Sequence, residues 1–381
     1  MKKALVTGGL GFIGSHLVDR LLNMEWEVVV LDNLSTGHRG NLTQQSDNTQ
    51  LSIVQGDIRN IQDIFSVIAG CDAVFHLAAH AMMRVSLGNH KTDLDNNLIG
   101  TLNVIEGMIT HEVPHLIFAS TSALYGEAEV VPTPEDYLGA QTSLYGAAKL
   151  AAEAYACAYT QFSPLQLWSF RFGTVIGERC RRGAVWDFTH KLLQTPADLE
   201  ILGNGQQKKD YLHVEDCIDG IMTGYEKSSG GINIFNVGLE EQTSVDELAD
   251  IVISEMALTD VKRRYTGGMH GWVGDNPVVY LSAEKLRSLG WRPAISPREA
   301  IRLTARWTID EMQHRSQGAV IESYGTEMDS GPSENTLALL SASPPVIPAA
   351  NTSPASPSAC QPPPPAAHAP TTRSINWLGS P

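Results

Sequence analysis

The sequence is poor in cysteine and in basic residues, and both deficits restrict its function. Its five cysteines lack the paired spacing of a disulfide framework or a metal site, so we expect reduced thiols and no bound metal; they stand at positions 71, 157, 180, 217 and 360. Lysine and arginine number 27 against 42 aspartates and glutamates, a formal net charge of −15. That balance argues against nucleic acid and anionic membrane surfaces as partners.

The chain also lacks membrane and targeting signals. No run of about 18 apolar residues occurs, which excludes a transmembrane helix. The N-terminus has two lysines and a short apolar run, but neither the longer apolar core nor the cleavage site of a signal peptide. We therefore expect a cytoplasmic protein.

The composition changes near residue 317. The preceding residues are ordinary for a globular protein and numerous enough for one large or two ordinary domains. Residues 317–381 are instead rich in Pro, Ser, Ala and Thr, with an unbroken run of prolines at 362–365. Such a segment buries too little apolar surface to offset chain entropy, so we expect a disordered tail. A proline-recognition motif is the alternative, although no basic anchor flanks the prolines.

Glycines interrupt the apolar pattern at the N-terminus. A short apolar run leads into Gly8, Gly11 and Gly14, and a second run, 28–31, ends at Asp32. Strand, glycine-rich turn, helix and strand within about 30 residues indicate a dinucleotide site, where backbone N–H groups approach a pyrophosphate. A carboxylate at Asp32 suits a ribose diol and repels a 2′-phosphate, which favours NAD over NADP. An ordinary turn and a plain strand-end residue are the alternatives.

Apolar runs and helical patterns alternate from there to about residue 175. Strands are predicted at 51–54, 73–77, 115–119 and 165–172, and helices at 61–68, about 93–110 and around Tyr145. This alternation predicts an α/β fold with a doubly wound parallel sheet, in which ligands bind beyond the carboxyl ends of the strands. Beyond residue 175 a mixed pattern predicts a smaller α/β region, with helices at 185–193, 215–227, 244–257 and 297–315 and strands at 200–202 and 232–237.

Tyr145 and Lys149 lie one turn apart on one helix face. A phenol has a pKa near about 10 and is a poor base at neutral pH. Because a nearby cation favours the phenolate, the pair is a candidate general acid or base. The same spacing also occurs on ordinary solvated helix faces. Thr121 and Ser122 end a predicted strand, so a Tyr on the following helix can point into the same crevice.

Three motifs together resemble the extended short-chain dehydrogenase/reductase superfamily, and within it the nucleotide-sugar epimerases: Gly8-x-x-Gly11-x-x-Gly14, Ser120-Thr121-Ser122 and Tyr145-x-x-x-Lys149. The resemblance covers about residues 1–315. It implies a Rossmann-type NAD domain at 1–175, with returning segments from about 205–240, and a mainly nucleotide-sugar-binding domain at 176–315. It also implies a homodimer through helices that begin near Asp93 and Ser143.

The resemblance further implies residue roles. Tyr145 removes the sugar hydroxyl proton, Lys149 binds the nicotinamide ribose and lowers the pKa of Tyr145, and Thr121 and Ser122 bridge Tyr145 and the substrate. The implied NAD-binding residues, besides Tyr145 and Lys149, are Gly8, Gly11, Phe12, Ile13, Gly14, Asp32, Asn33, Asp57, Ile58, Leu77, Ala78, Ala79 and Asn97. The implied contacts to a UDP-sugar are Arg84, Thr174, Val185, Lys209, Tyr211, His270 and Asp275. From position alone, Asp57 and Ile58 fit a simple loop as well as an adenine site.

Position 123 distinguishes reactions within this superfamily. The 4,6-dehydratases and the UDP-xylose-forming decarboxylases that this chain resembles carry an acidic residue at this position, whereas this chain has Ala123. Elimination thereby loses its proton donor, whereas epimerisation at carbon 4 needs none. We therefore favour an epimerase, with a dehydratase, a decarboxylase and a non-catalytic NAD-sensing scaffold as alternatives.

The sugar is predicted less sharply. The sequence around Arg84 and Thr174 resembles that of UDP-glucuronate 4-epimerases, and a guanidinium facing the sugar would suit the carboxylate of a uronate. The segment 183–213 resembles UDP-glucose 4-epimerases, so we favour a neutral hexose. Lys209 and His270 stand where related chains have phosphate-binding arginines, which predicts weaker UDP binding because a lysine offers phosphate only a point charge.

Overall fold

The computed structural model describes residues 1–82 and 90–317. These residues belong to the first of two units into which the chain divides, Met1–Thr336. Arg84 and residues 318–381, most of the predicted tail, lie outside the described residues. No helix in the described part of the chain has the length and apolar character needed to cross a membrane.

A seven-stranded sheet lies at the centre of this unit. Its order is β11-β6-β5-β4-β1-β2-β3, and every neighbouring pair is parallel. The strands are β1 (Lys3–Thr7), β2 (Glu27–Asp32), β3 (Leu51–Gln55), β4 (Ala73–His76), β5 (His115–Thr121), β6 (Gln166–Phe172) and β11 (Ile232–Val237). The strand order reverses between β1 and β4, which is the switch point where sheets of this class bind ligands. The predicted doubly wound parallel sheet is confirmed.

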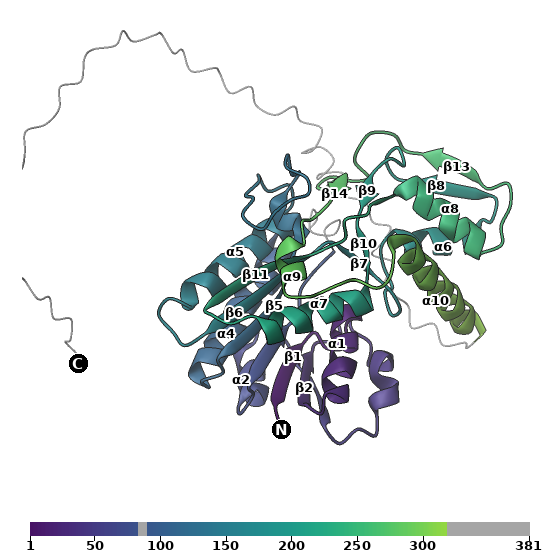
Figure 1. Ribbon diagram of the computed structural model, residues 1–381. Coiled ribbons are helices and arrows are strands. Elements are labelled where there is room, and N and C mark those ends of the chain that lie inside the picture. The colour runs from purple at the N-terminus through teal and green to yellow at the C-terminus, as the bar shows by residue number, and fades with distance from the viewer. Residues whose placement is uncertain (83–89, 318–381) are drawn as a thin grey trace, which may run out of the picture. The chain divides into compact units, whose positions relative to one another are not determined.

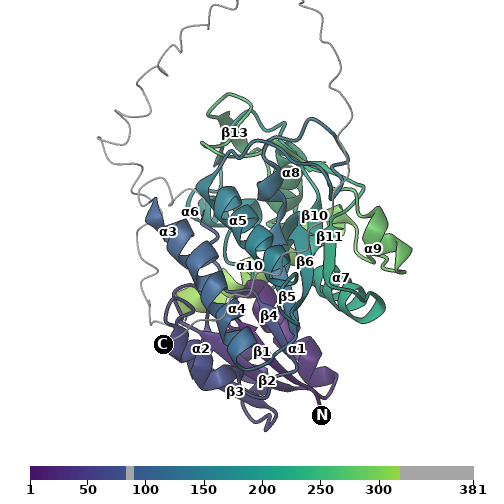
Figure 2. The same ribbon diagram turned by 90° about the vertical axis from the view of Figure 1, so that its left-hand side faces the viewer.

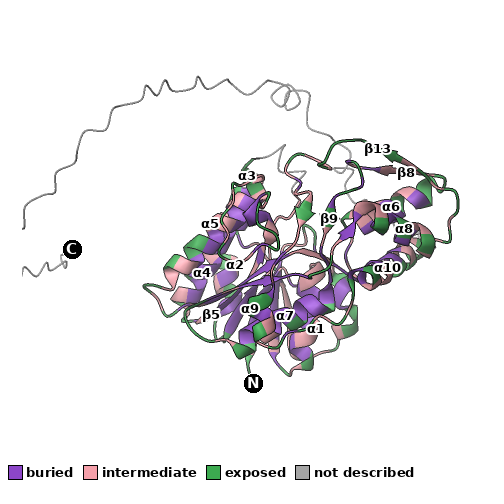
Figure 3. Ribbon diagram, turned by 45° about the horizontal axis from the view of Figure 1, so that its top comes forward, coloured by how far each residue is buried: buried purple, intermediate pink, exposed green. Residues whose placement is uncertain are grey.

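Helices cover both faces of the sheet, because alternate strand residues face opposite sides. On β1, Ala4 and Val6 join one core cluster and Leu5 joins the other. The first cluster includes residues of α1 and α7, and the second includes residues of α2, α4 and α5 (Figures 1 and 2). These helices are α1 (Phe12–Asn23), α2 (Ile61–Ile68), α4 (Gly100–Thr110), α5 (Leu144–Tyr159) and α7 (Val214–Lys227). Figure 3 shows buried positions gathered on the strands and on the helix faces toward them.

The helix predicted at about 93–110 has three parts. It begins as α3 (Lys91–Asp93), continues as the π-helical segment η3 (Leu94–Ile99) and ends as α4. Segments with π-helical bonding are rare and often mark functional sites. This one lies against α5 and therefore beside the helix that carries Tyr145.

The remaining elements form a second, smaller core. It gathers α6 (Ala184–Gln194), α8 (Val245–Glu255) and α10 (Pro297–Gln317), which pack on one another at the right of Figure 1. Three small sheets accompany them. Two are strand pairs, β7 (Thr174–Ile176) with β10 (Tyr211–His213) and β8 (Asp198–Ile201) with β13 (Lys262–Tyr265). The third has three strands, β9 (Lys208–Lys209) between β12 (Thr243–Ser244) and β14 (Val278–Val279). The strand predicted at 200–202 thus begins and ends earlier. The other short helices are η1 (Arg39–Gln45), η4 (Ser122–Tyr125) and α9 (Glu284–Ser288).

Candidate active site

The glycine-rich turn joins β1 to α1 and touches the end of β4. Gly8 has a φ of 70°, and a Cβ there would lie 2.7 Å from the backbone nitrogen of Ala78. Only glycine fits this conformation and this close approach without strain. Gly11 is the N-cap of α1 and donates its N–H to the Gly8 carbonyl at 3.0 Å. A Cβ on Gly14 would collide with that same carbonyl.

The N-terminus of α1 is open to an anion. No side chain caps it, and the first N–H bonded within the helix belongs to Ser15, which donates to Gly11 at 3.1 Å. The N–H groups of Phe12, Ile13 and Gly14 precede that bond and have no intrahelical partner. Exposed N–H groups and the helix dipole together favour a phosphate here.

Asp32 ends β2 beside this turn. Its carboxylate accepts the N–H of Leu10 at 3.0 Å and that of Leu34 at 2.8 Å. Burial raises the pKa of Asp32, and those two hydrogen bonds oppose the rise. Each carboxylate oxygen accepts one of these bonds and keeps a further lone pair, so both can still accept a ribose hydroxyl.

Asp57 lies after β3 and is engaged by its own loop. The Arg59 guanidinium and the Asn33 amide hold the pKa of Asp57 well below its usual range, with Arg59 Nη2 at 2.7 Å and Asn33 Nδ2 at 3.0 Å. Its backbone N–H donates to the Asp63 carboxylate at 2.8 Å. Ile58 is buried. The structure thus uses Asp57 to build the turn before α2, and its predicted adenine contact stays a prediction.

A buried histidine connects the end of β1 to α4, and no motif in the sequence indicated this role. His76 Nδ1 lies 2.7 Å from Thr7 Oγ1, and His76 Nε2 lies 2.9 Å from Thr101 Oγ1. Thr101 donates its own proton to the carbonyl of Asn97 at 2.7 Å, which assigns the ring proton to Nε2. Burial, and then the Lys149 charge, lowers the pKa of His76 to about 3. The ring is therefore neutral and structural.

Asn97 fixes the loop after β4. Its side chain accepts the N–H of His80 at 2.8 Å and donates to the His80 carbonyl at 2.9 Å. That clamp holds the predicted cofactor residues Leu77, Ala78 and Ala79, all partly buried, beside the glycine turn. The N–H of Ala78 reaches Thr7 Oγ1 at 3.3 Å. The structure therefore brings the predicted cofactor residues of β1 and β4 together.

Tyr145 stands in the first turn of α5, at the carboxyl end of β5. Ser143 caps this helix by accepting the N–H of Gly146 at 3.0 Å. Thr121 Oγ1 accepts the N–H of Ala123 at 3.1 Å and is also hydrogen-bonded to Tyr145. Ser122, the first residue of η4, is partly buried. The predicted Thr121 and Tyr145 pair is thus in contact.

The electrostatics of Tyr145 and Lys149 differ from the expectation. Burial raises the pKa of Tyr145, and Thr121 and Arg182, rather than Lys149, are the groups that lower it. Burial also lowers the pKa of Lys149 to about 7, because Lys149 is 1% exposed. Its Nζ lies 3.9 Å from the centre of the Phe118 ring. Loss of water disfavours both charged forms, and helical spacing carries no information about that loss.

The predicted substrate residues divide into two groups. Lys209 Nζ pairs with Asp275 at 2.7 Å and lies 5.2 Å from the Trp272 ring centre. His270 pairs with Glu127 at 2.8 Å. His270 and Trp272 border a cavity of about 430 Å³ whose other lining residues are Glu127, Thr142, Val273 and Gly274. The structure thus gathers Lys209, His270 and Asp275 on one side of the molecule.

The second group is more deeply placed. Val185 and Tyr211 are 2% and 3% exposed and pack in the smaller core, so their side chains offer no open surface to a sugar. Burial raises the pKa of Tyr211. Thr174 begins β7 and donates its N–H to Asp210 Oδ1 at 3.3 Å. Contacts of these residues with a substrate stay predictions, and Arg84 lies outside the described residues.

Three arginines precede α6, and only one of them faces Tyr145. Arg179 pairs with Asp19 at 2.8 Å, and Arg181 pairs with Glu311 at 2.8 Å. Arg182 is exposed, bonds the carbonyl of Ala81 at 3.4 Å and lowers the pKa of Tyr145. Within residues 1–82 and 90–317, no carboxylate pairs with Arg182. The sequence did not distinguish Arg182, because Arg179 and Arg181 precede it in the same loop.

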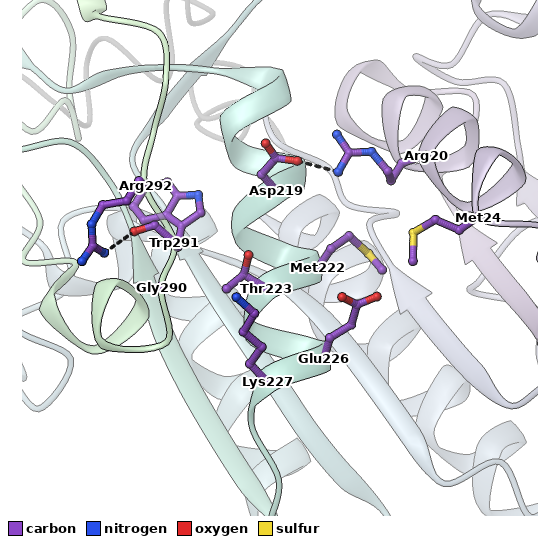
Figure 4. Close-up of a pocket in the computed structure, with 10 residues that line it drawn as sticks. All are labelled: Arg20, Met24, Asp219, Met222, Thr223, Glu226, Lys227, Gly290, Trp291 and Arg292. Atoms are coloured by element: carbon purple, nitrogen blue, oxygen red, sulfur yellow. Dashed lines mark hydrogen bonds and ion pairs between the residues drawn. The ribbon is translucent and has the colours of Figure 1, made fainter.

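A separate cavity of about 400 Å³ lies between α1 and α7. Figure 4 shows its lining, in which Arg20 pairs with Asp219 across the two helices. The other lining residues are Met24, Met222, Thr223, Glu226, Lys227, Gly290, Trp291 and Arg292. None of them is a predicted site residue, so this cavity is distinct from the site around Tyr145.

A parallel sheet with an uncapped helix N-terminus, an acid ending β2 and a Thr–Tyr–Lys set defines an NAD-dependent enzyme of the dehydrogenase/reductase type. Residues 4–238 match the NAD dependent epimerase/dehydratase family, and the chain belongs to that family. It is 33% identical over 315 residues to a putative UDP-glucose 4-epimerase of Methanocaldococcus jannaschii, covering 80% of this chain and 97% of the relative.

Two further comparisons mark the breadth of the family. The chain is 28% identical over 329 residues to UDP-glucuronic acid decarboxylase 1 of Danio rerio, covering 84% of this chain and 76% of the relative. The crystal structure of Thermus thermophilus UDP-glucose 4-epimerase in complex with NAD matches with a TM-score of 0.72 and 32% identity, covering 84% of this chain and 100% of that one. NAD is the cofactor of the family, and the open α1 terminus and Asp32 fit it.

Proposed function

We propose that the chain is an NAD-dependent 4-epimerase of a UDP-sugar of the glucose/galactose type. One observation carries the proposal: Tyr145, bonded to Thr121 at the end of β5, stands one turn from a buried Lys149 on the same helix. The open N-terminus of α1 and Asp32 lie at the neighbouring switch point of the sheet. A proton-transfer group therefore stands beside a dinucleotide site.

The residues divide the work of a reversible oxidation. NAD held at the α1 terminus and Asp32 would supply the acceptor for the hydride of sugar carbon 4 and the donor that returns it to the other face of the ring. Tyr145 takes the proton of the 4-hydroxyl and gives it back after the keto sugar has turned. Because Thr121 already accepts the Ala123 N–H, its own hydroxyl can donate to the Tyr145 oxygen and stabilise the phenolate. A charged Lys149 adds positive potential one turn away.

Position 123 supports epimerisation over elimination. Ala123 is 8% exposed inside η4, between Thr121 and Tyr125. An alanine there provides no proton to a departing hydroxyl, whereas a reversible oxidation returns every proton to its origin. The alternatives of dehydration and decarboxylation therefore rank below epimerisation.

A second candidate is a UDP-glucuronate 4-epimerase, and Arg182 favours it. The charge of its guanidinium lowers the pKa of Tyr145. Among the described residues it has no carboxylate partner, whereas the neighbouring Arg179 and Arg181 each have one. A uronate carboxylate next to the reacting carbon would complete a bidentate pair with it. A neutral hexose would meet the same arginine through hydroxyl groups only.

Product analysis tests the proposal. Purified protein is incubated with UDP-glucose, UDP-N-acetylglucosamine and UDP-glucuronate, and the products are separated and weighed. Epimers keep the substrate mass, whereas loss of water or carbon dioxide would show a dehydratase or a decarboxylase. We expect Tyr145→Phe to keep bound NAD and lose turnover by at least about a hundredfold. A fully active Tyr145→Phe would refute the proposal.

Arg182→Met decides between the two sugars. If a uronate is the substrate, this variant loses more activity on UDP-glucuronate than on UDP-glucose. Both sugars lose the support that Arg182 gives the Tyr145 phenolate, but only the uronate also loses a partner for its carboxylate. Arg264→Met is the control, since Arg264 is exposed and bonds Asp198 on the edge strands β8 and β13. Equal loss on both sugars would count against a role in sugar choice. No turnover with any sugar, together with a specific protein partner, would favour the scaffold alternative.

A further inference from the structure

A buried ion pair lies behind the first turns of α5. Glu153 is 3% exposed and Arg171 is 6% exposed. Arg171 Nε donates to both carboxylate oxygens at 3.2 Å, and Ser169 Oγ donates to Glu153 Oε2 at 2.6 Å. These bonds fix the position of the carboxylate from β6.

Arg171 is fixed from its other side as well. Its Nη1 donates to Tyr125 Oη at 2.8 Å and to the carbonyl of Glu135 at 2.6 Å. Tyr125 in turn donates to Asn236 Oδ1 at 2.6 Å. The guanidinium therefore connects η4, β6 and β11, and it cannot rotate away from Glu153 without breaking bonds on both sides.

Glu153 lies one turn after Lys149 on the same helix. Lys149 meets the face of Phe118 from β5, and the neutral His76 of β4 also stacks on that ring. Tyr145 lies one turn before Lys149 on α5, and Arg171 of β6 pairs with Glu153. Among the described residues, Glu153 is the acid that favours the Lys149 ammonium, which burial otherwise disfavours.

We infer that Glu153 is a positioning residue that keeps Lys149 charged at a place that excludes water. The inference rests on the proposed role of Lys149 beside Tyr145. Since Arg171 partly cancels the Glu153 charge, the potential at Lys149 is the difference between a near anion and a farther cation. Packing alone does not require this arrangement, because a buried ion pair adds little net stability over apolar residues of the same shape.

Direct titration of Lys149 tests the inference without relying on turnover. The NAD-loaded protein is labelled with ¹³C at lysine Cε, and Lys149→Arg assigns the signal. We expect Glu153→Gln to move the Lys149 titration midpoint to lower pH and Arg171→Gln to move it to higher pH. Glu106→Gln, which removes an exposed acid on α4, leaves it in place.

The sign of the Glu153→Gln shift decides between an electrostatic and a merely structural role. A loosened core would admit water and move the midpoint up toward 10.5, the ordinary value for lysine. A midpoint that rises or stays in place in Glu153→Gln would overturn the inference. If this variant does not fold, Glu153→Gln with Arg171→Met removes both charges together, and it must also lower the midpoint.

The rate profile provides a second readout. With the charge on Lys149 lost at lower pH, the alkaline limb of kcat in Glu153→Gln moves to lower pH while KM stays close to that of the wild type. A limb that does not move would contradict the inference. Failure of the proposed function would look different: Tyr145→Phe would stay active, and the NMR titration of Lys149 would be unaffected by that result.

Discussion

Replacement of Lys149 by methionine is expected to stabilise the cofactor-free protein at neutral pH while abolishing activity. Lys149 is 1% exposed, and burial is the main cause that lowers its pKa from 10.5 to about 7. A fall of that size corresponds to about 5 kcal/mol of free energy. This is an upper bound, because methionine forfeits the cation–π contact with Phe118. We expect a net gain of about 2 kcal/mol at pH 7.

The pH dependence follows from the direction of the shift. The unfolded chain binds the lysine proton up to pH 10.5, whereas the folded chain releases it near pH 7. Between these values the unfolded state binds more protons, so the wild type gains stability as pH rises. The advantage of Lys149→Met is therefore full below pH 7 and declines as pH rises from there toward 10.5.

Urea unfolding of both proteins at pH 6, 7, 8 and 9, after removal of NAD, measures this difference. Other titrating groups are common to both proteins and cancel in the comparison. Lys149→Gln is the control, since it is neutral but leaves an amide buried, and it should gain less. If Lys149→Met were less stable than the wild type by an amount independent of pH, the assigned charge penalty would be wrong.

Two further predictions concern the glycine turn and the outer face of α5. Gly8→Ala forces a φ of 70° on alanine and a Cβ contact with Ala78, so we expect a loss of about 1–3 kcal/mol in urea unfolding and loss of bound NAD; unchanged NAD content would contradict this. Tyr155 is 51% exposed on α5, and Leu94 and Ile99 are exposed on η3, which packs against α5. If these faces form the proposed homodimer, size-exclusion chromatography will show a dimer that Tyr155→Glu converts to a folded monomer.

The sequence predicted the elements whose signals are local. The apolar runs at 28–31 and 115–119, followed by Asp32 and by Ser-Thr-Ser respectively, fall within β2 and β5. The short strands β7, β9, β10, β12, β13 and β14 were not predicted, because two to four residues carry too little periodicity. The strand predicted at 200–202 was displaced because its pairing with β13, far along the chain, sets where β8 ends.

The sequence predicted the motif residues of the site but not the distant residues that interact with them. Spacing placed Tyr145 and Lys149 on one helix face, and the position of Thr121 at a strand end indicated it as a neighbour. Neither could indicate that Arg171 would reach Glu153, or that Arg182 rather than Arg181 would face Tyr145, because each pairing depends on how distant segments fold. The sign of the shift at Tyr145 was wrong for the same reason, since burial is a property of the whole fold.

Two residues of helix α5 must satisfy opposing requirements. To act beside a hydride acceptor, Tyr145 and Lys149 must stand where water is excluded, yet exclusion of water makes their charged forms unfavourable. The fold opposes that penalty at two places along the helix. At its start, Thr121 and Arg182 favour the phenolate. One turn beyond Lys149, Glu153 favours the ammonium, and Arg171 limits how strongly it does so. A change at this buried pair should therefore reach the chemistry at Tyr145 through charge, without moving the residues that touch the sugar.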